Sequence, residues 1–475
     1  MKYEIVVGLE VHAELSTKTK IYCSCKSAFG GEVNTLCCPV CTGMPGALPV
    51  LNRQVVAYAA KIGLAAGCKI NRICKQDRKN YFYPDLPKAY QISQFDIPLC
   101  EGGSIDFYHN GEKRTVRLTR IHIEEDAGKL LHEESFTGTL VDFNRCGVPL
   151  IEIVSEPDIR SAAEAKDYLE AVRMLLDTLD ICDCRMQEGS IRCDINVSVR
   201  PEGAHEYGTR VEMKNVNTFS GAMRAVEYES KRQIEVIENG GTIDQETRRW
   251  DDIKGVNVLL RSKEDAHDYR YFPEPDLLPI VIGDEWLEEI RGSIPELPVA
   301  KYERYRELGI PEFEAWLLVD SPGKAAFFEK CVEIGGISFK TAANLITGDM
   351  TALLNDKNLA IDLSPVSPAA ICLILAMVEK NTISLSASKR VLTEMFENGG
   401  EPAEIVERLS LAQVSDESEL LGIIREVLGE NEKSVSDYKN GKSNALGFLV
   451  GQCMRRSKGK GNPQILNRLL KSELE

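Results

Sequence analysis

The chain has 475 residues, of which 43% are apolar, a share that is enough for buried cores and that excludes extensive disorder. Its formal net charge of −16 argues against nucleic-acid binding over the whole surface, because phosphate contacts require positive charge. The most apolar stretch, residues 369–378, is too short for a membrane span, which needs about 20 residues, and the N-terminus carries no apolar run of signal-peptide length. We therefore expect a cytoplasmic protein of several domains that does not associate with membranes.

The first expected element is a strand near the N-terminus. Residues 1–15 alternate between apolar and polar side chains, with the period of two that is typical of a half-buried strand. The polar set includes Glu10, His12 and Glu14, so these side chains should share one face of the strand.

A cluster of cysteines follows this strand. Twelve of the 15 cysteines lie between residues 23 and 193. Cys23, Cys25, Cys38 and Cys41 form a CxC pair and a CxxC pair with turn residues around them, a pattern that predicts a closed, structural Zn²⁺ site. The alternative is a set of buried free thiols, because CxC is less typical than CxxC and the neighbouring Cys37 blurs the ligand set.

Cations and aromatic side chains are interleaved in residues 78–94, and two prolines keep this segment out of a helix. Lys79 and Lys88 can bind phosphate as point charges, whereas Tyr81 and Tyr83 can stack on a base or hydrogen-bond a ribose. The alternative is a packed loop in which the lysine stems cover apolar surface.

Several carboxylates recur within apolar strand patterns. Glu124 and Glu125 follow His122, and Glu152 lies inside the apolar run 148–154, where a buried carboxylate needs a partner. Acids that converge from separate strands can bind Mg²⁺ together with substrate phosphates, although each acid can also be exposed or paired with a cation. In a simple strand Glu124 and Glu125 face opposite sides, so not both need be ligands.

Further strands and two helices are expected before residue 293. Residues 193–200 and 210–214 alternate and present a charged row opposite an apolar one. That row includes Asp194, Arg200, Glu212 and Lys214. A capping box at residues 161–164 begins a helix that extends to residue 179, and a second helix is expected over residues 221–238.

The pattern becomes helical after two closely spaced prolines at residues 294–298. Helices with short loops are expected over residues 294–402, and a small helical domain over residues 403–475. Residues 433–475 contain nine Lys and Arg and three acids, a net charge of +6 on a chain that is acidic overall. This segment is either a nucleic-acid contact or a solvated basic tail.

The segment 78–94 and a series of other motifs resemble the family of the B subunit of aspartyl/glutamyl-tRNA(Asn/Gln) amidotransferase, and the resemblance covers essentially the whole chain. The motifs are RKNYFYPDLPK (78–88), YQISQ (90–94), GLEVH (8–12), RIHIEEDAGK (120–129), PLIEIVSEPD (149–158), EGSIRCD (188–194), KNVN (214–217), QETR (245–248), DYRYFPEPD (268–276), GFLVGQ (447–452) and NPQ (462–464).

The resemblance implies an α+β fold in three parts: a glutamine-synthetase-like cradle domain with a mixed or antiparallel sheet over residues 1–293, an all-helical domain over 294–402, and a helical YqeY-like tail over 403–475 that helps to hold tRNA. It also implies two partners in a heterotrimer: the amidase or A subunit, which releases ammonia from glutamine, and the small C subunit. The implied ligase reaction uses ATP to activate the side-chain carboxylate of misacylated Glu-tRNA(Gln) or Asp-tRNA(Asn). Ammonia then displaces phosphate.

The resemblance gives roles to the residues singled out above. It implies that Mg²⁺ is bound by Glu10, His12, Glu124, Glu125 and Glu152, and that the catalytic residues are Glu10, His12, Glu125, Lys79 and Lys88. The residues that it implies at the nucleotide or along the ammonia path are Lys79, Tyr81, Tyr83, Asp194, Arg200, Glu212 and Lys214. It implies a structural Zn²⁺ bound by Cys23, Cys25, Cys38 and Cys41. Two other functions stay open: a tRNA-binding scaffold whose chemistry lies in a partner, and a standalone amide ligase for a small molecule. The sequence does not distinguish Glu-tRNA from Asp-tRNA as the substrate.

Overall fold

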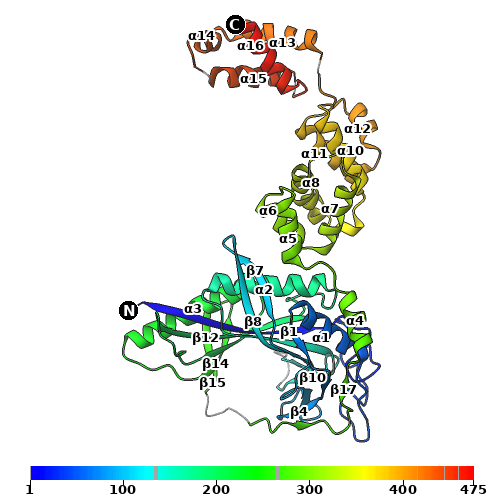
Figure 1. Ribbon diagram of the computed structural model, residues 1–475, viewed down its shortest axis with the longest axis vertical. Helices are drawn as coiled ribbons and strands as arrows, with labels where there is room; N and C mark the ends of the chain where they lie inside the picture. The colour runs from blue at the N-terminus through cyan, green and yellow to red at the C-terminus, as the bar shows by residue number, and fades with distance from the viewer. Residues whose placement is uncertain are drawn as a thin grey trace. The chain divides into compact units, whose positions relative to one another are not determined.

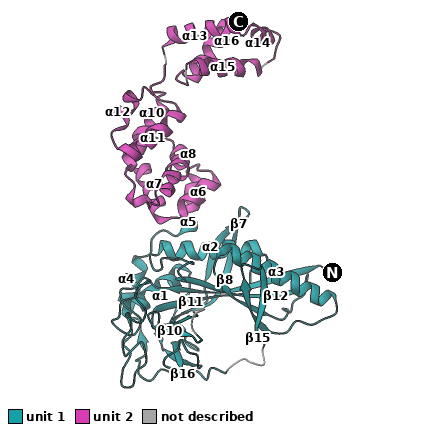
Figure 2. Cartoon of the chain, turned by 180° about the vertical axis from the view of Figure 1, so that it is seen from behind, with its two compact units in different colours: residues 1–300 teal, residues 301–475 magenta. Residues whose placement is uncertain are grey.

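The computed structural model describes residues 2–132, 137–262, 268–414, 416–442, 444–457 and 459–474. The chain divides into two compact units, residues 1–300 and 301–475, and each is described by itself (Figure 2). The expected α+β architecture is confirmed, because the first unit is built on a large sheet and the described part of the second consists of helices and their connections.

A ten-stranded sheet forms the centre of the first unit (Figure 1). Its order is β15-β14-β13-β12-β1-β11-β8-β6-β2, with β7 paired to β8. β13 and β14 run parallel, and the other pairs described in this sheet are antiparallel. The bounds are β1 Tyr3–Glu14, β2 Lys69–Ile70, β6 Cys100–Glu101, β7 Ser104–His109, β8 Glu112–Glu125, β11 Pro149–Ser155, β12 Ile191–Pro201, β13 Val211–Val216, β14 Glu246–Asp251 and β15 Val256–Ser262. The strand expected at the N-terminus is therefore β1, and it lies between β11 and β12.

Helices cover one face of this sheet. They are α1 (Arg53–Ala65), α2 (Ala162–Thr178) and α3 (Phe219–Glu238), and Figure 1 shows α2 and α3 running along the same side. The apolar members of the β1 alternation, Val7 and Leu9 among them, are fully buried. Alternation therefore leaves the polar members on the opposite face.

The expected capping box begins α2. The Ser161 hydroxyl accepts a hydrogen bond from the Glu164 N–H, so the helix starts where the sequence predicts. The helix expected over residues 221–238 begins two residues earlier, because the Thr218 side chain caps it by accepting from the Gly221 N–H.

Short sheets and one helix complete the first unit. The list is β16 (Phe272–Pro273), β4 (Asp77–Asn80) and β5 (Tyr90–Ser93) in one sheet, β9 (Lys129–Leu131) with β10 (Leu140–Asp142), β3 (Ile73–Cys74) with β17 (Ile280–Val281), and α4 (Asp284–Gly292). The segment with interleaved cations and aromatic residues thus contributes β4 and β5. β5 packs on β8, which brings this segment to the large sheet.

The helices after residue 297 are short. Their bounds are α5 Pro298–Glu307, α6 Glu312–Val319, α7 Pro322–Ile334, α8 Phe339–Leu345, α9 Thr351–Asp356, α10 Pro368–Glu379, α11 Leu385–Asn398, α12 Pro402–Arg408, α13 Glu417–Glu430, α14 Glu432–Lys439, α15 Asn444–Arg456 and α16 Pro463–Leu474, with a π-helical turn at Ile346–Met350 and a 3₁₀ turn at Ile361–Leu363. Proline begins α5, α7, α10, α12 and α16, where its missing N–H costs no helical hydrogen bond.

The last four helices enclose an apolar core of their own. Leu420, Ile424, Leu449, Leu466 and Leu470 are fully buried within it. A separate core supports the expected division near residue 402, which stays a prediction because the second compact unit spans residues 301–475 as a whole. Among the described residues, no helix combines the length and apolar character needed to cross a membrane.

Candidate functional site

The face of the large sheet opposite the helices is charged. Strand register sets Glu10 of β1 beside Asp194 of β12, and His12 beside Glu152 of β11. Glu152 in turn pairs with His122 of β8. Because neighbouring strands lie about 4.8 Å apart, these side chains are brought together from segments distant in the sequence.

The first cluster on this face, the His12 group, consists of His12, Glu124 and Glu152. The His12 Nε2 lies 3.7 Å from the Glu124 Oε1 and 3.6 Å from the Glu152 Oε2. One ligand atom from each of the three residues lies within 4.8 Å of the others. The His122 Nε2 adds a contact of 3.2 Å to the Glu152 Oε2, so Glu152 touches both imidazoles.

The surroundings of the His12 group keep the Glu152 carboxylate ionised. Burial alone would raise the pKa of Glu152, but His122, His12 and Lys79 outweigh it and hold that pKa well below its usual range. Burial would likewise lower the pKa of Lys79, but Glu124 and nearby tyrosines raise it. The group therefore combines two carboxylates, an imidazole and a neighbouring ammonium, which suits a divalent cation and a phosphate.

Aromatic side chains surround this ammonium. The Lys79 Nζ lies 4.9 Å from the ring centre of Tyr269 and 5.9 Å from that of Tyr81. Burial raises the pKa of Tyr81 to about 12, so its hydroxyl stays protonated. Tyr83 is exposed, with 51% of its surface accessible, and is not brought to the His12 group.

A second cluster, the Glu10 group, lies beside the first and consists of Glu10, Asp194 and Glu212, with ligand atoms again within 4.8 Å of one another. The Lys214 Nζ pairs with Asp194 and lies 2.8 Å from the Glu212 Oε1. The Asn196 amide donates to the Glu10 Oε1 at 2.9 Å. Burial, and then the nearby Glu152 carboxylate, raise the pKa of Glu10.

Cavities lie on both sides of these clusters. One of about 320 Å³ borders Glu10 and is lined by Gly8, Tyr207 and Arg210 among others. Another of about 540 Å³ borders Glu14 and Arg145. Glu14 is not a member of the His12 group. Burial, together with Asp126, raises the pKa of Glu14 to about 8.

Glu125 lies apart from the expected Mg²⁺ set. Successive residues of a strand point to opposite faces, so Glu124 joins His12 whereas Glu125 turns away. Glu125 pairs instead with Lys88, and its Oε1 accepts from the Ile92 N–H at 2.9 Å. Both side chains line a cavity of about 160 Å³ that Cys41 also borders.

Arg200 is also placed away from both clusters. It lies six residues beyond Asp194 on β12, a separation of roughly 20 Å along a strand. Its guanidinium pairs with Glu4 and lies 5.1 Å from the ring centre of Tyr207. Arg200 therefore makes an ion pair away from both clusters, and the role that the resemblance implied for it, at the nucleotide or along the ammonia path, stays a prediction.

The four predicted zinc ligands converge. The sulfur atoms of Cys23, Cys25, Cys38 and Cys41 lie within 4.8 Å of one another, and the Cys38 and Cys41 sulfurs are 3.9 Å apart. Tetrahedral Zn–S bonds of about 2.3 Å would set sulfurs about 3.8 Å apart, so the donor set and spacing fit Zn²⁺. Hydrogen bonding from the Cys23 thiol lowers the pKa of Cys41.

Comparison with known proteins identifies the family. The family model described as GatB/GatE catalytic domain matches residues 5–288, and the GatB domain model with the YqeY name matches residues 326–474. The chain belongs to the GatB family. Proteins named as the B subunit of aspartyl/glutamyl-tRNA(Asn/Gln) amidotransferase from Caldicellulosiruptor bescii, Thermoanaerobacter pseudethanolicus and Clostridium botulinum (strain Loch Maree) are 56%, 55% and 49% identical to it, over 100% of this chain and at least 99% of each relative.

Sequence reasoning gave no site role to several polar residues that lie at this site. His122 shares a face with Glu124 by alternation, so the signal was present in the β8 pattern. Its buried Nδ1 has no hydrogen-bond partner among the described residues. Asn196 could be found in the same way from β12, whereas Thr247, although it lies in the QETR motif, could not be placed beside Glu212 because β14 joins the sheet by a distant parallel pairing.

Proposed function

We propose that this chain is the subunit of a tRNA-dependent amidotransferase that uses ATP to activate the side-chain carboxylate of a misacylated Glu-tRNA(Gln) or Asp-tRNA(Asn) and then passes the activated group to ammonia in the cytoplasm. The names of its relatives support the reaction class, a ligase that forms a carbon–nitrogen bond. The single observation that carries the proposal is the His12 group, where two acids and an imidazole from three strands share one sheet face beside Lys79.

The proposed reaction has two balanced steps. The substrate carboxylate attacks the γ-phosphorus of ATP, and ADP leaves as an acyl phosphate forms. Ammonia then attacks the acyl carbon and loses one proton, and the bond between the acyl carbon and the phosphate oxygen breaks, so that phosphate leaves. Bound Mg²⁺ would neutralise charge on the transferring phosphoryl group. Lys79 would stabilise the same developing charge from the side of the tyrosines.

The donor sets fit this cation. Carboxylate oxygens are the ligands that Mg²⁺ and Mn²⁺ prefer, and the ionised Glu152 and the neighbouring Glu124 supply them, with His12 completing the His12 group. In the Glu10 group, the Lys214 ammonium already bridges Asp194 and Glu212. We propose that a divalent cation replaces it there and that the released lysine contacts phosphate.

The nucleoside part of ATP is proposed to occupy the cavity of about 320 Å³ beside Glu10. Tyr207 offers an aromatic surface for the base and Arg210 a cation for phosphate. This assignment moves the nucleotide away from Tyr83 but keeps it near Arg200, whose guanidinium lies 5.1 Å from the ring centre of Tyr207.

Ammonia is proposed to arrive by the opposite side of β8. Lys88 and Glu125 line a cavity of about 160 Å³ there, one peptide unit away from Glu124. The chain shows neither a thiol-type glutaminase pattern nor a Ser-Ser-Lys amidase signature, so a partner must supply ammonia. We therefore propose an amidase (the A subunit) and a small third protein (the C subunit) as partners.

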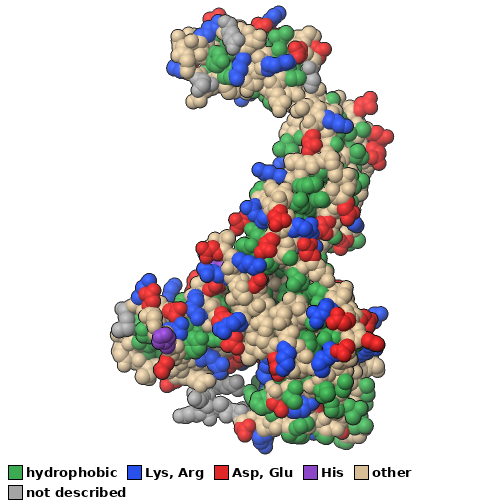
Figure 3. Space-filling model, viewed as in Figure 1, with side chains coloured by type: hydrophobic (Ala, Val, Ile, Leu, Met, Phe, Trp, Pro, Cys, Tyr) green, Lys and Arg blue, Asp and Glu red, His purple; other side chains and the backbone are tan. Residues whose placement is uncertain are grey.

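Exposed apolar side chains support a protein partner on the sheet unit. Met44, Leu48, Val50, Leu278 and Val281 are each more than half exposed. Figure 3 shows hydrophobic side chains gathered at the lower end of this unit. Exposed apolar surface of this kind is typical of an interface between proteins.

The tail is proposed to contact tRNA. Lys433, Lys439, Arg455 and Lys471 are exposed on α14, α15 and α16, and Figure 3 shows Lys and Arg side chains on one face of this region. Other tail cations, such as Arg468, pair with acids of the same domain. Arg468 is exposed as well, so what distinguishes the first four cations is that the described residues give them no acid partner, and this leaves them for phosphate.

We predict one structural zinc ion per chain, held by the four clustered cysteines. Metal analysis of the purified protein should find one equivalent, and Cys41→Ser should lose it and lower the melting temperature, because a closed zinc site contributes folding free energy. Cys37→Ser is the matched control and should keep the metal, since its thiol contacts the Asn34 carbonyl. If the purified protein holds no zinc and the four clustered cysteines titrate as free thiols, they form a set of free cysteines and not a metal site.

The test of the function is an assay of the purified three-subunit complex with ATP and glutamine. ADP formation should require Glu-tRNA(Gln) or Asp-tRNA(Asn) and should accompany Gln-tRNA or Asn-tRNA. ADP formation with free glutamate and no tRNA would favour a standalone amide ligase. Comparing the two misacylated tRNAs also decides which substrate this chain serves.

A further inference from the structure

Glu212, in the Glu10 group, is held at both carboxylate oxygens. Its Oε1 accepts from the Lys214 ammonium at 2.8 Å, and its Oε2 accepts from the Thr247 hydroxyl at 2.8 Å. The two donors differ in kind. The lysine ammonium ends a flexible four-carbon stem, whereas the threonine hydroxyl lies one bond from Cβ and is fixed by the strand.

The strand that carries Thr247 reaches Glu212 by a parallel pairing. β13 and β14 are in register with Glu212 beside Thr247, and Thr247 is buried. β15 closes the other edge of β14 in antiparallel register. Thr247 belongs to the QETR motif at 245–248, which neither the Mg²⁺ set nor the proposed nucleotide contacts use. This motif thus places a hydroxyl against the Glu212 carboxylate.

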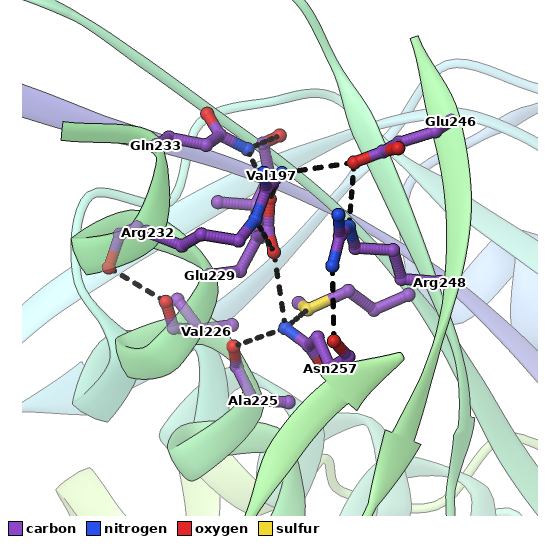
Figure 4. A network of polar contacts seen from close by, with 11 residues as sticks. Val197, Ala225, Val226, Glu229, Arg232, Gln233, Glu246, Arg248 and Asn257 are labelled. Atoms are coloured by element: carbon purple, nitrogen blue, oxygen red, sulfur yellow. Dashed lines mark hydrogen bonds and ion pairs between the residues drawn. The ribbon is translucent and has the colours of Figure 1, made fainter. Parts of the chain in front are cut away.

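A buried polar network holds β14 in this position (Figure 4). Its centre is Glu229 of α3, which is fully buried and pairs with Arg232 at 2.7 Å. Arg232 also reaches Glu246 on β14 at 3.1 Å. Glu246 in turn accepts from Arg248 at 2.6 Å, and Arg248 donates to the Asn257 carbonyl on β15 at 3.1 Å.

The same network also connects β15 to α3. The Asn257 amide donates to Glu229 at 3.3 Å, and the Gln233 amide joins Glu229 to the Val197 carbonyl of β12. Figure 4 shows these side chains converging between the helix and the strands. Because a buried carboxylate is costly to leave unpaired, the network gives β14 one defined position.

We propose that Thr247 is a positioning residue that orients Glu212 toward the cation of the Glu10 group, with the Glu229 network holding its strand in place. This inference rests on the proposed function, in which that group holds a divalent cation of the nucleotide. With its Oε2 fixed by Thr247, Glu212 presents its Oε1 on the side of Asp194 and Glu10, where Lys214 now lies.

The test removes the hydroxyl without changing the size of the side chain. Thr247→Val keeps the shape and loses the hydrogen bond, whereas Thr247→Ser keeps the hydroxyl. Thr242→Val, an exposed position in the loop after α3, is the matched control. All three are made in a Glu152→Gln background, in which the His12 group lacks a ligand and the Glu10 group is the site under observation.

Binding of Mn²⁺ to the full chain is titrated by electron paramagnetic resonance, and the melting temperature is recorded for each variant. Thr247→Val should weaken Mn²⁺ binding roughly 10-fold at an unchanged melting temperature, and Thr247→Ser should restore most of it. Unchanged Mn²⁺ affinity in Thr247→Val, or an equal loss in the serine variant, would overturn the inference. A three-subunit complex that amidates no tRNA while the Thr247→Val effect persists would overturn the proposed function alone.

Discussion

Replacing Glu152 by glutamine is expected to lower aminoacyl-tRNA-dependent ADP formation by on the order of 100-fold. Glu152 touches both His12 and His122, and its carboxylate is ionised despite burial. The amide removes a charge that a divalent cation needs and turns an N–H donor toward the imidazoles. The rate should be measured in the three-subunit complex at saturating tRNA and ATP.

Glu101→Gln is the matched control for this change. Glu101 lies on the same sheet, at β6, but pairs with Lys69 near the surface. The control should keep its rate, and both variants should keep the fold as judged by circular dichroism. A Glu152→Gln complex that forms ADP within a few-fold of the wild-type rate would favour a role for this chain as a tRNA-binding scaffold only.

Removing the tail should weaken tRNA binding at least about 10-fold. A chain that ends at Ala412 lacks α13–α16 and their exposed cations, but keeps the core of the preceding helices, because the tail encloses an apolar core of its own. Every phosphate contact that the truncation removes should also make the dependence of log affinity on log salt shallower by about 1. Fluorescence anisotropy with misacylated tRNA at several salt concentrations measures both effects.

A charge-reversal pair separates specific contacts from bulk charge. Lys439→Glu with Arg455→Glu should reproduce much of the loss of affinity, whereas Lys330→Glu with Lys340→Glu makes the same change on exposed positions of α7 and α8 and should have a small effect. Equal losses in the two pairs would mean that net charge, not the tail, governs binding. Unchanged affinity in the truncated chain would support a small-molecule amide ligase.

Much of the fold follows from local patterns. The alternation in residues 1–15 predicted β1, and the Ser161 capping box predicted the start of α2, because both depend on neighbours in the chain. The predicted start of α3 was wrong by two residues, since the capping role of Thr218 was not recognised in the sequence.

The site was predictable in its residue types but not in its grouping. Five residues were assigned to one Mg²⁺ set, and the structure distributes them over three places, because strand order and register are long-range properties. Alternation already indicated that Glu124 and Glu125 diverge. The role expected for Arg200 stays a prediction, because its position on a charged row does not show how far along the strand the cluster extends.

The most direct test of the central claim follows the oxygen atoms of the substrate. Glu-tRNA(Gln) with ¹⁸O in its side-chain carboxylate is incubated with the complex, Mg²⁺-ATP and ammonia, and the released phosphate is analysed by mass spectrometry. If the carboxylate is phosphorylated on this chain, each phosphate carries one ¹⁸O atom, and Glu152→Gln slows the transfer by on the order of 100-fold. Phosphate without ¹⁸O, formed alongside Gln-tRNA, would contradict the account.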